Sequence, residues 1–158
     1  MAIQPRFAQA ILSGSKNVEF RKRRVADDVK TVLIYETSPT QRIVGRFNVK
    51  RIVEKSPIAL WREFGSVGGI SRRDYLDYFA GHSQAVALVV ENPEVYDYPI
   101  RLSQLAGPPA VPQSFTYLPA SILTEVESWQ GVSHVQPLPR RLVRIFHVPK
   151  RAIAAGTR

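Results

Sequence analysis

The sequence predicts an α+β fold in which a few helices accompany a mixed β-sheet or barrel. A short helical pattern comes first, and several runs with the alternation of strands follow it. Two consecutive helical patterns then interrupt the strands before the last ones begin. At 158 residues, with 44% hydrophobic and 22% charged residues, the chain has the size of one domain with its own core.

The first elements are a helix and a strand joined by a glycine. Residues 5–12 carry apolar side chains at helical spacing behind Pro5, and Gly14 is placed to end that helix with a positive φ. Residues 17–23 alternate, which predicts a strand with Glu19 and Arg21 on the same face.

The remaining elements follow from caps, breakers and alternation. Residues 31–35 predict a buried strand, and residues 42–53 predict a strand long enough to bend around a small barrel. Ser56 and Ser71 are expected N-caps of two successive helices that end at Gly65 and Gly81. The later predictions are strands at 84–91 and 95–100, a helix at 121–129 and a strand at 141–148.

The positive charge belongs to the two ends of the chain. The net charge is +9, with 12 Lys and Arg against 5 Asp and Glu in residues 1–55 and 6 against 2 in residues 111–158. Residues 56–110 hold 4 against 6. Clustered cations attract phosphates, so this distribution favours a polyanion-binding face, with solubility alone as the other interpretation.

Several classes of protein and site are not indicated. The chain has no cysteine, and its three histidines lack ligand spacing, so we expect no metal site and no cofactor. The N-terminal residues do not resemble a signal peptide, and the longest apolar run is too short to span a bilayer. We therefore expect a cytoplasmic protein without a membrane partner.

Residues 14–21 read GSKNVEFR and match the pattern G-x-K-x-x-E-x-R directly after the first predicted helix. By this motif the chain resembles the ASCH family of the PUA-like superfamily. The resemblance covers residues 3–118 and includes Gly45-Arg46-Phe47 and Pro112-Gln113-Ser114-Phe115. It implies a PUA-like mixed β-barrel, with the first helix packed beside a cleft for RNA, a nucleotide or a modified base and with a two-helix insertion. We expect residues 119–149 to extend this domain and residues 150–158 to form a flexible basic tail.

Lys16, Glu19 and Arg21 are the candidate catalytic and binding residues of the motif. A lysine can hold a phosphate, or act as a base if desolvation lowers its pKa. A carboxylate can accept from an amino group of a base, and a guanidinium can bind a phosphate or carbonyl with two donors. The alternative is structural, with Glu19 and Arg21 neutralising one another and Lys16 solvated.

Further candidates surround this motif. Tyr35, Phe115 and Tyr117 are candidates for base stacking, with core packing as the simpler interpretation of each. Residues 65–69 predict a glycine-rich hinge between two helices, and Arg21 begins a run of four cations. The complete predicted ligand-binding set is Gly14, Lys16, Glu19, Arg21, Arg23, Tyr35, Ser38, Arg46, Gln113, Ser114 and Phe115.

The resemblance leaves the activity open. We favour an RNA- or nucleotide-binding domain, and the rival is an enzyme on the same scaffold, either a ribonuclease or an amidohydrolase of an acylated cytidine. The amidohydrolase-like relatives carry a hydroxyl residue three positions after the lysine and a glutamate before the second capped helix. In this chain the position three after the lysine is Glu19, which has no hydroxyl group. The segment before the second capped helix, residues 68–70, contains no carboxylate. DNA is a less favoured partner, because Arg72 and Arg73 are accompanied by Asp74 and Asp77.

Overall fold

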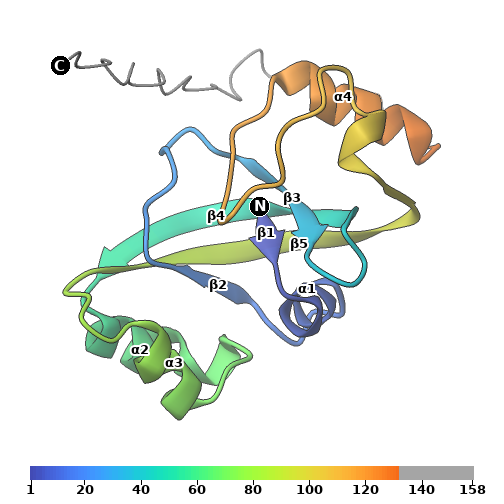
Figure 1. Ribbon diagram of the computed structural model, residues 1–158. Coiled ribbons are helices and arrows are strands. Elements are labelled where there is room, and N and C mark those ends of the chain that lie inside the picture. The colour runs from blue at the N-terminus through green and yellow to red at the C-terminus, as the bar shows by residue number, and fades with distance from the viewer. Residues whose placement is uncertain (132–158) are drawn as a thin grey trace, which may run out of the picture.

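The computed structural model describes residues 1–131, in which five strands form one mixed sheet (Figure 1). The strands are β1 (Ala2–Ile3), β2 (Val18–Arg21), β3 (Thr31–Glu36), β4 (Arg42–Lys55) and β5 (Ala85–Ile100). Their order in the sheet is β1-β3-β4-β5-β2. Only the pairing of β1 with β3 is parallel, and the other pairs are antiparallel. The predicted α+β class is therefore confirmed.

The sheet of the described residues is not closed, so the expectation of a barrel needs correction. Its two edges are β1 and β2, and the free edge of β1 is occupied by other groups. The backbone N–H of Ala2 donates to Ser114 O at 2.8 Å, and the Arg21 side chain donates to Ala2 O at 2.8 Å. A loop and one guanidinium thus take the place that a β1–β2 ladder would need.

The two strands predicted at 84–91 and 95–100 form one long strand, β5. The register against β4 shifts between Arg46 and Asn48, opposite Asn92, which has a φ of 48°. A β-bulge at this place accommodates Pro93 within the strand, because the bulged residues leave the regular ladder.

Four α-helices accompany the sheet: α1 (Pro5–Leu12), α2 (Pro57–Phe64), α3 (Arg72–Tyr78) and α4 (Ala120–Trp129). Two short 3₁₀ helices occupy Gly65–Val67 and Leu102–Gln104. The side chains of Ser56 and Ser71 accept from the backbone N–H groups of Ala59 and Asp74, as expected of N-caps. The predicted two-helix insertion therefore corresponds to α2 and α3, which lie between β4 and β5 in the chain.

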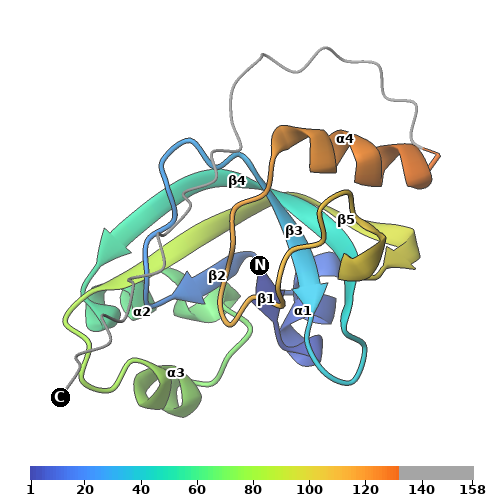
Figure 2. The ribbon, with the colours of Figure 1, turned by 45° about the horizontal axis from the view of Figure 1, so that its top comes forward.

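The helices cover different parts of the sheet. In Figures 1 and 2, α2 and α3 lie at one end of the long strands and α4 lies at the other end. Tyr75 of α3 packs with Phe20 of β2, whereas Ile122 and Val126 of α4 share a cluster with Tyr35 and Ile43. Ile11 of α1 packs in a third cluster with residues of β3 and β4. The predicted strand at 141–148 and tail at 150–158 lie outside the described residues.

Candidate functional site

Lys16, Glu19 and Arg21 form a buried ionic triad that extends from the turn before β2 to the last residue of that strand. Glu19 lies 3.4 Å from Lys16 Nζ and 2.8 Å from Arg21 Nη2. The three residues are 2%, 6% and 8% exposed. Strand alternation puts Glu19 and Arg21 on one face, as predicted, and the turn at Gly14 brings Lys16 to the same place. The structure brings the three together as mutual partners, and Lys16 is not solvated.

The environment of Lys16 lowers its pKa. Its Nζ donates to the carbonyl of Gly68 and lies 5.2 Å and 5.3 Å from the ring centres of Phe7 and Phe20. Burial lowers the pKa of Lys16 from the usual 10.5, and the charge of Glu19 opposes that change. This lysine is therefore a better base than an exposed one.

Arg21 has a buried donor without a partner among the described residues. Its Nη2 donates to Ala2 O at 2.8 Å and forms an ion pair with Glu19 Oε1 at the same distance. Its Nε–H is buried and has no hydrogen-bond partner among the described residues. A buried donor left without an acceptor is unfavourable, so this group is suited to an acceptor that a ligand supplies.

A pocket of about 610 Å³ opens above the triad. Ala2, Ile3, Gln4, Arg6 and Phe7 line the side of β1 and α1, and Ile70, Asp74, Asp77 and Tyr78 line the side of α3. Lys16, Glu19, Phe20 and Arg21 line the part that β2 contributes, and Thr37, Gln113 and Ser114 complete the wall. The volume falls within the range of about 300–1,000 Å³ that small-molecule sites occupy.

The glycine-rich segment before α3 packs directly on the triad. A Cβ at Gly68 would lie 2.5 Å from Phe20 Cε2, and one at Gly69 would lie 3.0 Å from Lys16 Cβ. These glycines allow the backbone to approach both side chains closely enough for Gly68 O to accept from Lys16. The segment therefore forms a close contact with β2, which differs from the predicted hinge.

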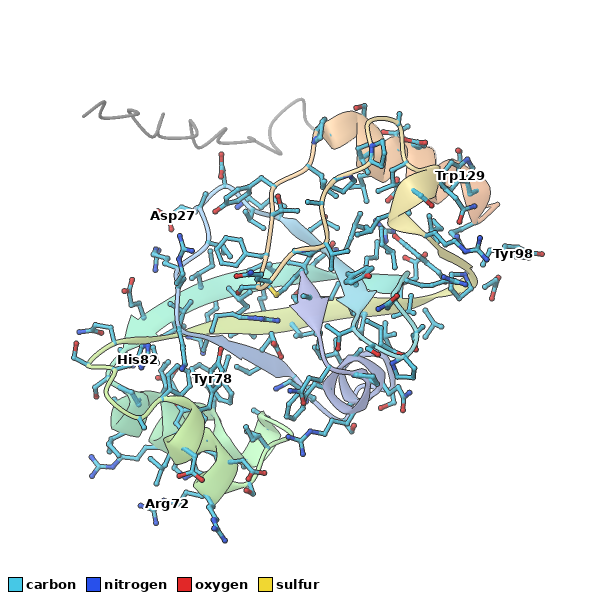
Figure 3. The ribbon with its side chains drawn as sticks, in the orientation of Figure 1. Asp27, Arg72, Tyr78, His82, Tyr98 and Trp129 are labelled. Atoms are coloured by element: carbon cyan, nitrogen blue, oxygen red, sulfur yellow. The ribbon has the colours of Figure 1, made fainter. Side chains whose placement is uncertain are left out.

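The rim of the pocket carries aromatic rings with cations above them. Arg6 lies 4.4 Å from the centre of the Phe7 ring, and Lys22 lies 4.7 Å from the centre of the Tyr78 ring. Tyr78 is 38% exposed and lies between α3 and β2 in Figure 3. The sequence predicted core packing for Tyr78, because its spacing continues the apolar face of the helix, yet it lies at the end of α3 and remains accessible.

The other predicted ligand-binding residues separate into two groups. Gln113 and Ser114 line the pocket, whereas Arg23 and Ser38 are exposed outside its lining and Gly14 forms the turn after α1. Thr37 lines the pocket in place of its neighbour Ser38.

Of the predicted stacking residues, Tyr35 belongs to the core, whereas Phe115 and Tyr117 are partly buried and lie outside the lining of the pocket above the triad. Tyr35 is buried with Ile43 and Tyr96, and Phe115 packs beside a separate buried cluster. Tyr117 accepts a hydrogen bond from the backbone N–H of Ala26 at 2.9 Å. The sequence pattern did not reveal whether these three side chains point toward the pocket or the core. Each residue lies in a loop or a strand with several apolar neighbours, so the alternation is not clear.

Arg46 is not among the residues that line the pocket, and it holds α4 to the sheet. Its Nη2 lies 2.8 Å from Glu94 Oε2, and its Nη1 donates to Glu127 of α4. The three side chains are partly buried. The prediction that Arg46 contacts the ligand lacks support in this geometry, because α4 covers the residue.

Sequence reasoning missed most of the rim. Arg6, Asp74 and Asp77 are ordinary charged residues of amphipathic helices, and only the docking of α1 and α3 on both sides of β2 turns them toward one pocket.

A second pocket of about 70 Å³ is lined mainly by apolar side chains, among them Phe115 and Leu123. Among residues 1–131 there is no group of three potential metal-ligating side chains and no helix long and apolar enough to cross a bilayer.

Comparison with known proteins identifies the family. The sequence model of the ASCH domain matches residues 1–94, more than half of the chain. The chain belongs to the ASCH domain family. A relative from Zymomonas mobilis, named an ASCH domain-containing ribonuclease, is 34% identical over 122 residues, which cover 75% of this chain and 82% of the relative. A large ribosomal subunit protein uL22 from Ureaplasma parvum is 32% identical over 119 residues, but this ASCH domain spans only 38% of that protein.

Solved structures agree with this assignment. The crystal structure of ASCH from Zymomonas mobilis is similar with a TM-score of 0.75 and 30% sequence identity. The similarity covers 81% of this chain and 92% of the other. The fold of this ASCH domain is therefore that of its family, with the open sheet described above.

Proposed function

We propose that this ASCH domain binds RNA and that the pocket above Lys16, Glu19 and Arg21 takes one of its nucleotides. The observation that carries the proposal is that Arg21, whose buried Nε–H lacks an acceptor among the described residues, lines a pocket of about 610 Å³. Aromatic rings and side-chain amides also line this pocket, in the combination that single-stranded RNA sites use. The net charge of +9 attracts a polyanion to the protein.

The first test compares two tyrosines, of which only one lines the pocket. Tyr78 lines it, whereas Tyr98 is 68% exposed and lies at the opposite end of the molecule (Figure 3). Tyr78→Ala is expected to weaken binding of a labelled single-stranded RNA by about 5-fold or more, since stacking on one base contributes about 1–3 kcal/mol. Tyr98→Ala is expected to bind like the unchanged protein, as measured by fluorescence anisotropy.

Two outcomes would contradict the proposal at different points. If the unchanged protein does not bind RNA at low ionic strength, RNA is not its ligand. If RNA binds but the two tyrosine variants bind equally well, the pocket is not the binding site.

Ribonuclease activity is the second candidate, and the name of the relative from Zymomonas mobilis favours it. Cleavage without metal requires a base that takes the proton of the 2′-hydroxyl, whose oxygen then attacks the phosphorus. The 5′-oxygen leaves with a proton from an acid, and a cation stabilises the phosphorane. In this second candidate, Lys16 with its lowered pKa is the base and Arg21 is the cation.

An assay with a chelator separates binding from cleavage. Labelled RNA is incubated with the unchanged protein and with Lys16→Met, and an acylated cytidine is included as an alternative substrate. A 2′,3′-cyclic phosphate product that Lys16→Met does not form would support the second candidate. Binding of RNA without any product would leave the binding function and reject the ribonuclease.

A further inference from the structure

The pocket carries no net formal charge, although the chain as a whole is strongly basic. Arg6, Lys16 and Arg21 are its cations, and Glu19, Asp74 and Asp77 are its carboxylates. The three of each sign cancel, while the whole chain has a net charge of +9. The field that attracts RNA must therefore come from other parts of the surface.

The charges are also separated in space. At the floor, Glu19 pairs with both of its cationic neighbours, so the triad keeps one net positive charge. At the rim, α1 contributes the exposed cation Arg6, whereas α3 contributes the two exposed carboxylates Asp74 and Asp77. Among the lining residues, the α1 side of the opening is thus basic and the α3 side is acidic, with Lys22 over the Tyr78 ring beside them.

We propose that the pocket admits the uncharged base of a nucleotide and that the phosphates stay outside it, on the side of Arg6. This inference rests on the proposed RNA-binding function and specifies which part of the RNA enters. A phosphate moved into the pocket would lose water, and the one net positive charge of the floor would be offset by repulsion from the two carboxylates of the α3 side. A base needs no counter-charge, and its carbonyl oxygen or ring nitrogen can accept from the Nε–H of Arg21.

Base binding and RNA cleavage by Lys16 place different parts of the RNA at the floor of the pocket. Cleavage by Lys16 requires the scissile phosphate to reach the buried triad. With the base in the pocket, the phosphodiester remains at the rim near Arg6, away from Lys16.

The first experiment observes the Nε–H signal of Arg21 in nuclear magnetic resonance spectra of the full chain. Adenosine, cytidine, guanosine and uridine are added one at a time, followed by inorganic phosphate and by a short single-stranded RNA. At least one nucleoside and the RNA are expected to shift the Arg21 signal, and phosphate at the same concentration is expected to leave it unchanged. A shift with phosphate but with none of the nucleosides would overturn the inference.

The second experiment tests the acidic side of the rim. Asp74→Asn combined with Asp77→Asn is expected to increase affinity for the labelled RNA by about 2- to 5-fold at low ionic strength, because nearby repulsion is removed. Glu91→Gln combined with Asp97→Asn changes the net charge equally at exposed positions outside the pocket and is expected to increase affinity less. Equal gains from the two pairs would show that the α3 side does not face the RNA backbone and would overturn the inference.

Arg6→Gln separates the basic side from the pocket itself. This variant is expected to weaken RNA binding by about 2- to 5-fold and to leave the nucleoside-induced shift of Arg21 unchanged. A loss of the nucleoside shift would place Arg6 against the base and overturn the inference. If neither RNA nor any nucleoside binds the unchanged protein, the proposed function itself fails.

Discussion

Glu19 is the only carboxylate in contact with two buried cations at the pocket floor, within the described residues. Removing water from three charged groups is unfavourable, and their mutual attraction offsets this only while all hydrogen bonds and ion pairs remain. The triad has a net positive charge, and one donor of Arg21 has no partner among residues 1–131. At the scale of single residues, a ligand that accepts a hydrogen bond from Arg21 is therefore expected to stabilise the site relative to the empty pocket.

Replacing Glu19 should destabilise the fold more than replacing Lys16. Glu19→Gln leaves Lys16 and Arg21 buried without a counter-charge, which is expected to lower the free energy of unfolding by about 3 kcal/mol or more. Lys16→Met retains the Glu19–Arg21 ion pair and is expected to cost about 1–2 kcal/mol. Urea denaturation of both variants measures the difference. Equal losses would show that Glu19 does not act as the shared counter-charge.

The lowered pKa of Lys16 predicts a pH dependence of stability. Between its folded-state pKa and the unfolded value of 10.5, the unfolded chain holds the proton more strongly than the folded one. The contribution of Lys16 to the free energy of unfolding should therefore rise as the pH increases toward 10.5. Denaturation of the unchanged protein and of Lys16→Met, from neutral pH upward, isolates this contribution. A difference between the two that does not change with pH would contradict the prediction.

At the scale of elements, the connection between α2 and α3 determines how the pocket is enclosed. The turn at Gly68 and Gly69 packs against Lys16 and Phe20, and the backbone N–H of Asn17 donates to Val67 O at 2.9 Å. Because this segment is held to β2, α3 stands beside the motif and places Asp74 and Tyr78 at the rim.

Gly69 and Gly81 allow the effect of crowding to be separated from that of backbone conformation. Both have a positive φ, +61° and +75°, but only Gly69 is crowded, by the Lys16 side chain. Alanine at either position is expected to cost about 1–2 kcal/mol for the left-handed conformation. Gly69→Ala is expected to cost about 1–3 kcal/mol more from overpacking and to weaken RNA binding. Thermal and urea denaturation measure the stabilities, and similar values for the two variants would show that the turn is not tightly packed on Lys16.

At the scale of the whole molecule, the net charge comes from residues other than those that line the pocket. Residues 132–158 contain six Lys and Arg and no Asp or Glu, so they contribute +6 of the net charge of +9. The remaining residues carry 16 Lys and Arg against 13 Asp and Glu. Affinity for phosphates and selection in the pocket can therefore be altered independently.

Neutralising basic residues near the C-terminus should reduce the salt dependence of RNA binding. The substitutions are Arg140→Gln, Arg141→Gln and Arg144→Gln, made together in the full chain. The slope of log K against log salt is expected to fall by about 0.7 for each RNA phosphate that the protein no longer neutralises. A control with the same charge change comprises Lys50→Gln, Arg62→Gln and Arg101→Gln. Equal slopes for the two triple variants would show that only the net charge matters.

Local patterns were sufficient for much of the fold. Ser56 and Ser71 cap their helices with hydrogen bonds to residues three positions on, and such short-range contacts can be predicted from neighbouring residues. The GSKNVEFR motif indicated the family for the same reason, because its residues lie in one continuous turn and strand. The bulge at Asn92 and the open edge between β1 and β2 escaped prediction, since they depend on register between distant strands.

The sequence by itself determined the α+β class, the family and the closeness of Lys16, Glu19 and Arg21, because periodicity and short-range geometry control these features. Only the tertiary structure decided that the three are buried together, that Arg46 joins Glu127 of α4 across 81 positions, and that Asp74 and Asp77 line the same pocket as Arg6. The physical reason is that burial and charge pairing depend on which surfaces pack together over long separations. Such packing is a property of the whole chain, which no single segment specifies.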